Sequence, residues 1–168
     1  LTESALASAA ELHVDCFERQ MRFLHEHGHV TLTLAEFAVH HAVGAFPERS
    51  LLITFDDGYR SFLEHAHPVL RAYGFGAVLF PVVAYRPGLQ RSLLWSEHLS
   101  FHDIRRMHVE GGLVEVGSHT YDLHHETEAG LPAALRQPWE TASEQLERVG
   151  EGLGVSRVLL RMQTDQEV

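Results

Sequence analysis

Two groups of residues in this sequence have side chains suited to metal-assisted or acid–base chemistry. The first is the adjacent pair Asp56 and Asp57, which follows an apolar run at residues 51–53. Two neighbouring carboxylates at the end of a buried strand repel each other, and burial adds a desolvation cost. A fold that keeps such a pair most often compensates it with a cation, so we expect a bound metal ion nearby.

The second group lies about sixty residues later, at residues 118–125, and also follows an apolar run. It contains His119, His124 and His125. One carboxylate with two imidazoles is a common ligand set for a catalytic divalent ion. If one Asp of the first pair and two of these histidines bind the ion, the other Asp is left free to act as a base.

The composition limits the classes of protein to consider. The chain has 168 residues, 45% of them hydrophobic, which suits a single domain with a sizeable core. Its formal net charge of −10 argues against nucleic acid and anionic membrane as partners. A single cysteine, Cys16, permits no internal disulfide.

No run approaches the roughly 20 apolar residues of a membrane helix. The first residues form no signal peptide, and we expect an excised piece of a longer product.

Strands and helices alternate along the sequence. Apolar runs predict strands at residues 51–55, 76–83 and 113–117, the first of them buried on both faces. Helices are predicted from the spacing of apolar residues at 14–27, 33–43, 61–73 and 100–111, with capping patterns at Thr33 and Ser100. Asp15 is a candidate cap for the first helix, and Pro138 suits the first turn of a last helix that ends near residue 153.

This order predicts an α/β fold with a parallel sheet. In such folds, ligands bind to loops at the carboxyl ends of the strands. Asp56 and Asp57 end the first predicted strand, and His119 follows the third. We therefore expect the two groups to meet at one edge of the sheet.

The two groups together resemble the motifs of the polysaccharide deacetylase family, carbohydrate esterase family four. Its first motif, T-F-D-D-G, matches residues 54–58, and its second, S-H-T followed shortly by His, matches residues 118–120 and a later histidine. Most members place the second histidine four residues after the first, whereas His124 is five after His119. In this respect the sequence is most similar to the poly-N-acetylglucosamine deacetylases.

The resemblance implies a distorted (β/α) barrel, a role for each matched residue, and an extracytoplasmic or cell-surface location. Asp56 corresponds to the general base, and Asp57, His119 and His124 to the metal ligands, with His125 as the competitor of His124. Zinc is the expected metal, and cobalt, nickel or iron would suit the same ligands. The implied reaction is hydrolysis of N-acetyl groups from poly-N-acetylglucosamine, or from a chitin-like or peptidoglycan-like polymer, with release of acetate.

The sequence departs from the family after about residue 154. The family's third motif is unrecognisable in residues 155–162, and its last two motifs are absent. We therefore interpret residues 1–168 as one deacetylase-like domain that is truncated after about residue 154. Weak activity at most is expected, and an open sheet edge would favour a homodimer.

Other interpretations remain open from the residues alone. The chain could be a non-catalytic metal- or glycan-binding remnant, or a related amidohydrolase acting on a small cyclic amide. The alternating His25, His27 and His29 could form a second metal site, although a polar helix end is the simpler interpretation. Trp95 and Trp139 could stack on sugar rings or pack in the core.

Overall fold

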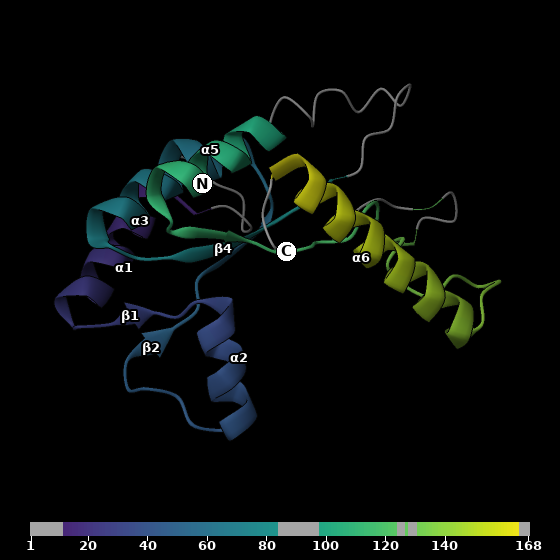
Figure 1. The fold of residues 1–168 in the computed structure, drawn as a ribbon, viewed down its shortest axis with the longest axis horizontal. Coiled ribbons are helices and arrows are strands. Elements are labelled where there is room, and N and C mark those ends of the chain that lie inside the picture. The colour runs from purple at the N-terminus through teal and green to yellow at the C-terminus, as the bar shows by residue number, and fades with distance from the viewer. Residues whose placement is uncertain (1–11, 84–97, 124–126, 128–130, 165–168) are drawn as a thin grey trace.

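The computed structural model describes residues 12–83, 98–123, 127 and 131–164. Its helices and strands alternate along the chain (Figure 1). The elements, in order, are α1 (Val14–Glu26), β1 (Val30–Thr31), α2 (Leu34–Val43), β2 (Ser50–Leu51), β3 (Thr54–Asp57), the π-helical turn η1 (Phe62–Ala66), α3 (His67–Tyr73), β4 (Ala77–Pro81), α5 (Phe101–Gly111), β5 (Val114–Val116) and α6 (Ala142–Thr164).

The strands form two parallel sheets. The larger has the order β3-β4-β5, in which Thr54 pairs with Val78 and Ala77 pairs with Val114. The smaller sheet pairs β1 with β2. All described strand pairs are parallel, so the α/β prediction is confirmed. Trp95 lies outside the described residues.

The core lies around the three-stranded sheet. Its central strand β4 contributes Val78 and Leu79, and α3 and α5 contribute Leu70 and Met107, all of them almost fully buried. Helix α1 adds Phe17 and Met21, four residues apart on one helix face. Burial of these apolar side chains is the main contribution that fixes the sheet, and the sheet in turn fixes the strand ends.

The predicted strand at residues 51–55 is wrong in two respects. It is split, because the Leu51 carbonyl accepts from the Leu32 N–H beside the small sheet, whereas the Ile53 carbonyl accepts from the Val78 N–H of the large sheet. The chain therefore crosses between the sheets at residues 52–53. The strand is also only half-buried, with alternating exposure along β3.

The predicted helix at residues 61–73 exists but contains a wider turn. Pro68 has no N–H, and its ring would clash with the carbonyl four residues earlier in a regular helix. The chain accommodates it with the π-helical turn η1, in which the His67 N–H donates to the Phe62 carbonyl, five residues back. Helix α3 then starts at His67, with the proline in its first turn.

The capping predictions have mixed outcomes. Thr33 and Glu36 form the predicted capping box of α2, and Ser100 and Asp103 exchange the equivalent hydrogen bonds at the start of α5. Helix α1 is capped by the His13 side chain and not by Asp15. Helix α6 begins four residues after Pro138.

Helix α6 also runs about eleven residues beyond its predicted end near residue 153 and ends at Thr164. Thr141 caps it through reciprocal bonds with Glu144. The stretch at residues 155–162, which carries no recognisable third family motif, is helical. In Figure 1, α6 lies at the far side of the molecule from α1, and its C-terminal half packs against α5.

Candidate active site

The carboxylate pair lies at the carboxyl end of β3. Phe55 packs its ring against Phe17 and Phe62, and thereby fixes the strand. The next two side chains differ in exposure, because Asp56 is 66% exposed and Asp57 is 30% exposed. Asp56 therefore faces solvent, whereas Asp57 is turned toward the interior of the site.

The backbone at Asp57 has an uncommon conformation. Its φ angle is +64°, and Gly58 follows with φ of +73°. A Cβ at position 58 would lie 2.8 Å from Pro81 Cβ, so only glycine fits there. Two successive left-handed residues turn the chain sharply away from the strand. Such strained backbone at a non-glycine residue is often found at functional sites.

The imidazole of His119 follows β5, two strands away in the sheet. A Cβ at Gly117 would overlap the ring of Phe80, so glycine lets Phe80 lie close beneath this segment. The Phe80 and His119 rings then meet edge to face, with centroids 6.5 Å apart. Thr120, directly after the histidine, is also left-handed, with φ of +72°.

The two groups meet as the sequence predicts. His119 Nε2 lies 3.5 Å from Asp57 Oδ1 and 4.0 Å from Asp56 Oδ1. His124 and its competitor His125 lie outside the described residues. The structure therefore brings together three of the four predicted site residues, while their chemical roles remain predictions.

The spacing of Asp57 and His119 fits a shared divalent ion. Two ligand atoms that each lie about 2.1 Å from one tetrahedral ion are roughly 3.4 Å apart. The observed 3.5 Å separation needs little adjustment, and a carboxylate with an imidazole suits zinc and related ions. Within the described residues no cluster of three or more potential metal ligands is found, and His124 is not among those residues.

The alternating histidines at the end of α1 have a structural role. His25, His27 and His29 each place Nδ1 against a backbone carbonyl, those of Tyr73, Phe23 and Leu24, at 2.7–3.2 Å. A carbonyl only accepts hydrogen bonds, so each Nδ1 donates a proton there. These contacts favour the helix-end interpretation over a second metal site.

Helix α6 packs against the segment that contains His119. The Ser118 hydroxyl donates to the Leu153 carbonyl at 3.2 Å. A Cβ at Gly152 would lie 3.7 Å from Leu123 Cδ1 and 3.8 Å from the Tyr121 nitrogen. A Cβ at Gly152 would therefore just touch this segment, and only a larger side chain would have to displace it.

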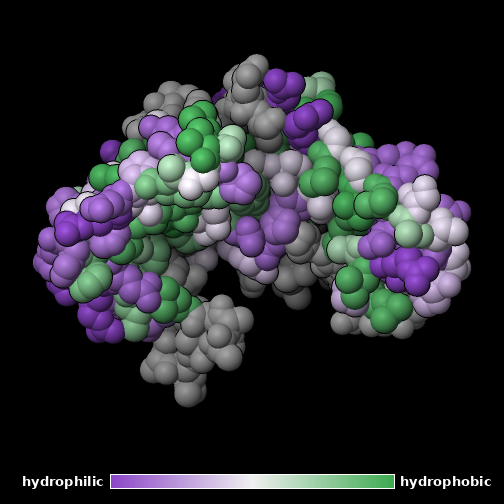
Figure 2. Space-filling view, turned by 90° about the horizontal axis from the view of Figure 1, so that it is seen from below, coloured by the Kyte–Doolittle hydropathy of each residue, from purple (hydrophilic) through white to green (hydrophobic). Residues whose placement is uncertain are grey.

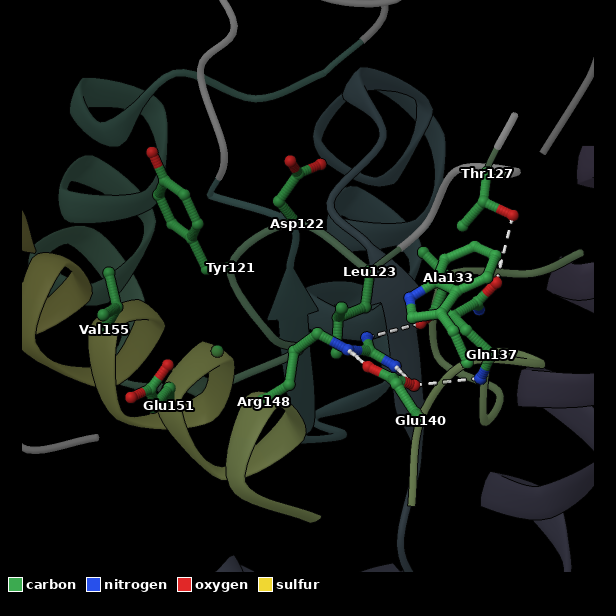
Figure 3. A pocket seen from close by; sticks show the side chains of 12 residues that line it. Tyr121, Asp122, Leu123, Thr127, Ala133, Gln137, Glu140, Arg148, Glu151 and Val155 are labelled. Atoms are coloured by element: carbon green, nitrogen blue, oxygen red, sulfur yellow. Dashed lines mark hydrogen bonds and ion pairs between the residues drawn. The ribbon is translucent and has the colours of Figure 1, made fainter. Parts of the chain in front are cut away.

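A pocket of about 460 Å³ is lined by residues that begin with Tyr121, two positions after His119 in the sequence. Figure 3 shows Tyr121 and Asp122 on one side of it and Arg148 with Glu140 on another, with Glu151 and Val155 from α6. Sequence reasoning missed the Glu140–Arg148 pair, because Glu140 lies before the helix and eight-residue spacing is not a regular helical pair.

The Glu140–Arg148 ion pair is bidentate. Arg148 Nε donates to one oxygen of Glu140 at 2.6 Å, and Nη2 donates to the other at 2.9 Å. These hydrogen bonds hold the pKa of the Glu140 carboxyl at about 2 and raise the pKa of Arg148. The pair is therefore charged at neutral pH and ties the loop before α6 to that helix.

The protein is similar to known deacetylases in sequence and in structure. The model of the polysaccharide deacetylase family matches residues 44–160. A poly-beta-1,6-N-acetyl-D-glucosamine N-deacetylase of Staphylococcus aureus (strain MSSA476) is 33% identical over 108 residues, which are 64% of this chain and 36% of that protein. The enzyme of the same name from Escherichia coli (strain K12) is 27% identical over 167 residues, covering 88% of this chain and 25% of that protein.

Among solved structures, IcaB from Ammonifex degensii superposes with a TM-score of 0.74 and 26% identity. That match covers 97% of this chain and 66% of the IcaB structure. The chain spans between a quarter and about a third of the length of the two curated relatives.

Proposed function

Because the chain belongs to the polysaccharide deacetylase family, we propose that it hydrolyses N-acetyl groups from a hexosamine-containing polysaccharide and releases acetate. The supporting observation is the approach of His119 Nε2 to Asp57 Oδ1 at 3.5 Å and to Asp56 Oδ1 at 4.0 Å, across two motifs from distant strands. The names of the two curated relatives favour poly-β-1,6-N-acetylglucosamine as the polymer.

In this proposal Asp57, His119 and His124 hold a divalent ion, and zinc is the metal we favour. Asp57 is the less exposed carboxylate and the closer one to His119, which suits a ligand. When bound, such an ion would supply Lewis-acid activation of the acetyl carbonyl and of the attacking water. Cobalt, nickel and iron suit the same donor atoms.

Asp56 is proposed as the general base. Its carboxylate is more exposed and farther from His119, so it is free to accept a proton from water while the water oxygen attacks the acetyl carbon. The bond between the acetyl carbon and the amide nitrogen then breaks. The water oxygen leaves in acetic acid, which ionises to acetate, and the amide nitrogen receives the proton from Asp56 and leaves as the free amine.

Location and assembly form part of the same proposal. A surface polysaccharide as substrate implies an extracytoplasmic location. No helix among the described residues is long and apolar enough to cross a membrane. Within the described chain, β3 and β5 are the outer strands of their sheet, and pairing of such an edge with a second copy stays a prediction.

The test separates the two carboxylates. Asp56→Asn should lower kcat for acetate release from N-acetylglucosamine oligomers by about 10²–10⁴-fold and leave the metal content of the purified protein unchanged. Asp57→Asn should lose most of the bound metal together with activity. Asp15→Asn, at a well-exposed carboxylate on α1, is the matched control and should alter neither.

Two outcomes would contradict this assignment. Loss of metal in Asp56→Asn would make Asp56 a ligand and reverse the roles of the pair. Stoichiometric metal with no acetate release from wild-type protein would favour a non-catalytic metal- or glycan-binding role.

A further inference from the structure

We propose that the pocket lined by Tyr121 binds a second pyranose ring of the polymer, and that Trp139 is the aromatic surface on which this ring stacks. The proposal rests on the proposed function, since it places a neighbouring sugar beside the one that loses its acetyl group. It gives the enzyme a binding subsite formed by the loop before α6 and by that helix.

The first observation is the exposure of Trp139. This side chain lines the pocket and is 69% exposed. An indole is the largest apolar side chain, and leaving it in water forfeits the free energy that its burial would supply. A flat aromatic ring at the edge of a pocket offers a face on which the C–H face of a sugar ring can pack.

The second observation is that the backbone around Trp139 is held in place before any ligand binds. Trp139 lies in a turn in which the Gln137 N–H donates to Glu140 Oε2 at 2.9 Å and the Glu140 N–H donates to the Gln137 carbonyl at 3.0 Å. Arg148 fixes Glu140 through the bidentate pair and donates to the Ala133 carbonyl at 2.6 Å.

The Gln137 side chain secures the other end of this turn. It is buried, its amide nitrogen donates to the carbonyls of Pro132 and Leu135, and its oxygen accepts from the Thr127 hydroxyl. A turn fixed at both ends needs little further ordering when a ligand binds. Preorganisation of this kind reduces the entropic cost of association.

The third observation is the position and chemistry of the pocket. Tyr121 and Asp122 line it and are only two and three residues after His119 in sequence. The volume of about 460 Å³ falls within the range of roughly 300–1,000 Å³ typical of small-molecule sites. Glu151 adds a carboxylate to the lining, so the pocket combines an aromatic face with acceptors for sugar hydroxyls.

The Glu140–Arg148 pair is assigned a structural role and not a role in sugar binding. Both charged groups are hydrogen-bonded to each other, and this pairing holds the turn in place. The chemical class that fits an aromatic face with hydroxyl-binding groups beside a deacetylation site is a pyranose of the same chain.

The experiment compares Trp139→Ala with Leu135→Ala. Leu135 is also an exposed apolar residue of this loop but does not line the pocket, and its backbone carbonyl would still accept from Gln137 and Arg148. Each variant is assayed for acetate release from N-acetylglucosamine itself and from its β-1,6-linked and β-1,4-linked pentamers.

Trp139→Ala should raise KM for the pentamer by about tenfold, the effect of losing an aromatic anchor. Its kcat, and its kcat/KM for the single sugar, should stay near wild type. Trp139→Phe should recover part of the loss, and Leu135→Ala should match wild type. An unchanged KM for the pentamer in Trp139→Ala would overturn the proposal.

A binding measurement separates this proposal from the proposed function. The chain has two tryptophans, so Trp95→Phe leaves Trp139 as the only indole, and its fluorescence is titrated with the pentamer. A saturable change without acetate release from wild-type protein would support the subsite while overturning the activity. Acetate release without any fluorescence change would overturn the subsite alone.

If Trp139→Ala instead abolishes self-association in light scattering and leaves KM unchanged, Trp139 is a protein-docking residue and the subsite is wrong.

Discussion

Different interactions stabilise the three-stranded sheet and the region of the chain that follows it. In the sheet, the central strand β4 buries Leu79 completely among apolar side chains of the core. In the region formed by residues 131–141 and the first half of α6, apolar side chains such as Leu146, which is 73% exposed, face outward. Hydrogen bonds of Gln137 and Arg148 hold that region in place.

This contrast applies directly to the candidate site. Asp56 and Asp57 stand on a strand fixed by burial of apolar surface, whereas the segment from His119 to Leu123 rests against α6. Figure 2 shows hydrophobic surface on the side of the molecule that α6 and the preceding loop occupy, and the exposed apolar residues there include Leu135, Trp139 and Leu146. The two carboxylates therefore stand on a strand held by apolar packing, whereas the His119 segment also contacts α6, through the Ser118–Leu153 hydrogen bond and the approach of Leu123 to Gly152.

The largest effect should distinguish the two regions by stability. Leu79→Ala removes a fully buried side chain and should lower the free energy of unfolding by about 2–5 kcal/mol. Leu146→Ala, at an exposed position of α6, should change it by less than about 0.5 kcal/mol. Urea unfolding followed by circular dichroism measures both. If the two variants lost equal unfolding free energy, Leu146 would be buried in solution, and the two regions would not differ in how they are stabilised.

The same contrast explains how much of the fold could be predicted from the sequence. Strand β4 lies within a continuous apolar run, and β5 lies in an apolar stretch that Glu115 interrupts. The Thr33 and Ser100 caps have local partners three residues away. Such features depend on neighbours along the chain, so pattern reasoning finds them. The crossing between sheets at residues 52–53 depends on Leu32 and Val78, which are distant in sequence.

The end of α6 was mispredicted for a related reason. The apolar residues that predict this helix extend only to Leu153, and Gly150, Gly152 and Gly154 each lower helix propensity by about 1 kcal/mol relative to alanine. The helix continues because its second half packs on the core, where Leu160 and Ser156 are fully buried. Tertiary packing thus overrides local propensity.

The candidate site was easier to predict in identity than in geometry. The family resemblance stated from residues 54–58 and 118–120 is confirmed by the match over residues 44–160. The left-handed backbone of Asp57, and the need for glycine at position 117 next to the Phe80 ring, appear only in the folded structure. Neither is visible in the local sequence.

A smaller effect should test the dependence of His119 on α6. A leucine at position 152 would have to displace the segment at Tyr121 and Leu123, because even a Cβ would reach contact distance there. Gly152→Leu should therefore lower kcat/KM for acetate release by about 10–100-fold through misplacement of the site.

Gly154→Leu is the matched control. A Cβ at this position meets nothing within 4 Å, so this variant gains helix propensity without displacing the site segment. It should keep wild-type activity and unfold at a slightly higher temperature. If both variants lose activity equally, the effect is one of helix dynamics and not of contact with the site segment.

The smallest expected effect concerns acid stability of the polar region. Arg148 lowers the pKa of Glu140 in the folded protein to about 2, below its ordinary value of 4.5. A carboxyl with a lowered folded pKa stabilises the protein above its unfolded pKa, and this stabilisation is lost as the pH falls from about 4.5 toward 2. Glu140→Gln removes this contribution, so its Tm should fall less steeply than the wild-type Tm across that window, and differential scanning calorimetry measures the difference. Glu147→Gln, at an exposed position of α6 next to Arg148, should follow the wild-type curve. Parallel curves for wild type and Glu140→Gln would mean that the ion pair forms equally in the unfolded chain or contributes nothing, and the loop before α6 would then be held by the Gln137 hydrogen bonds alone.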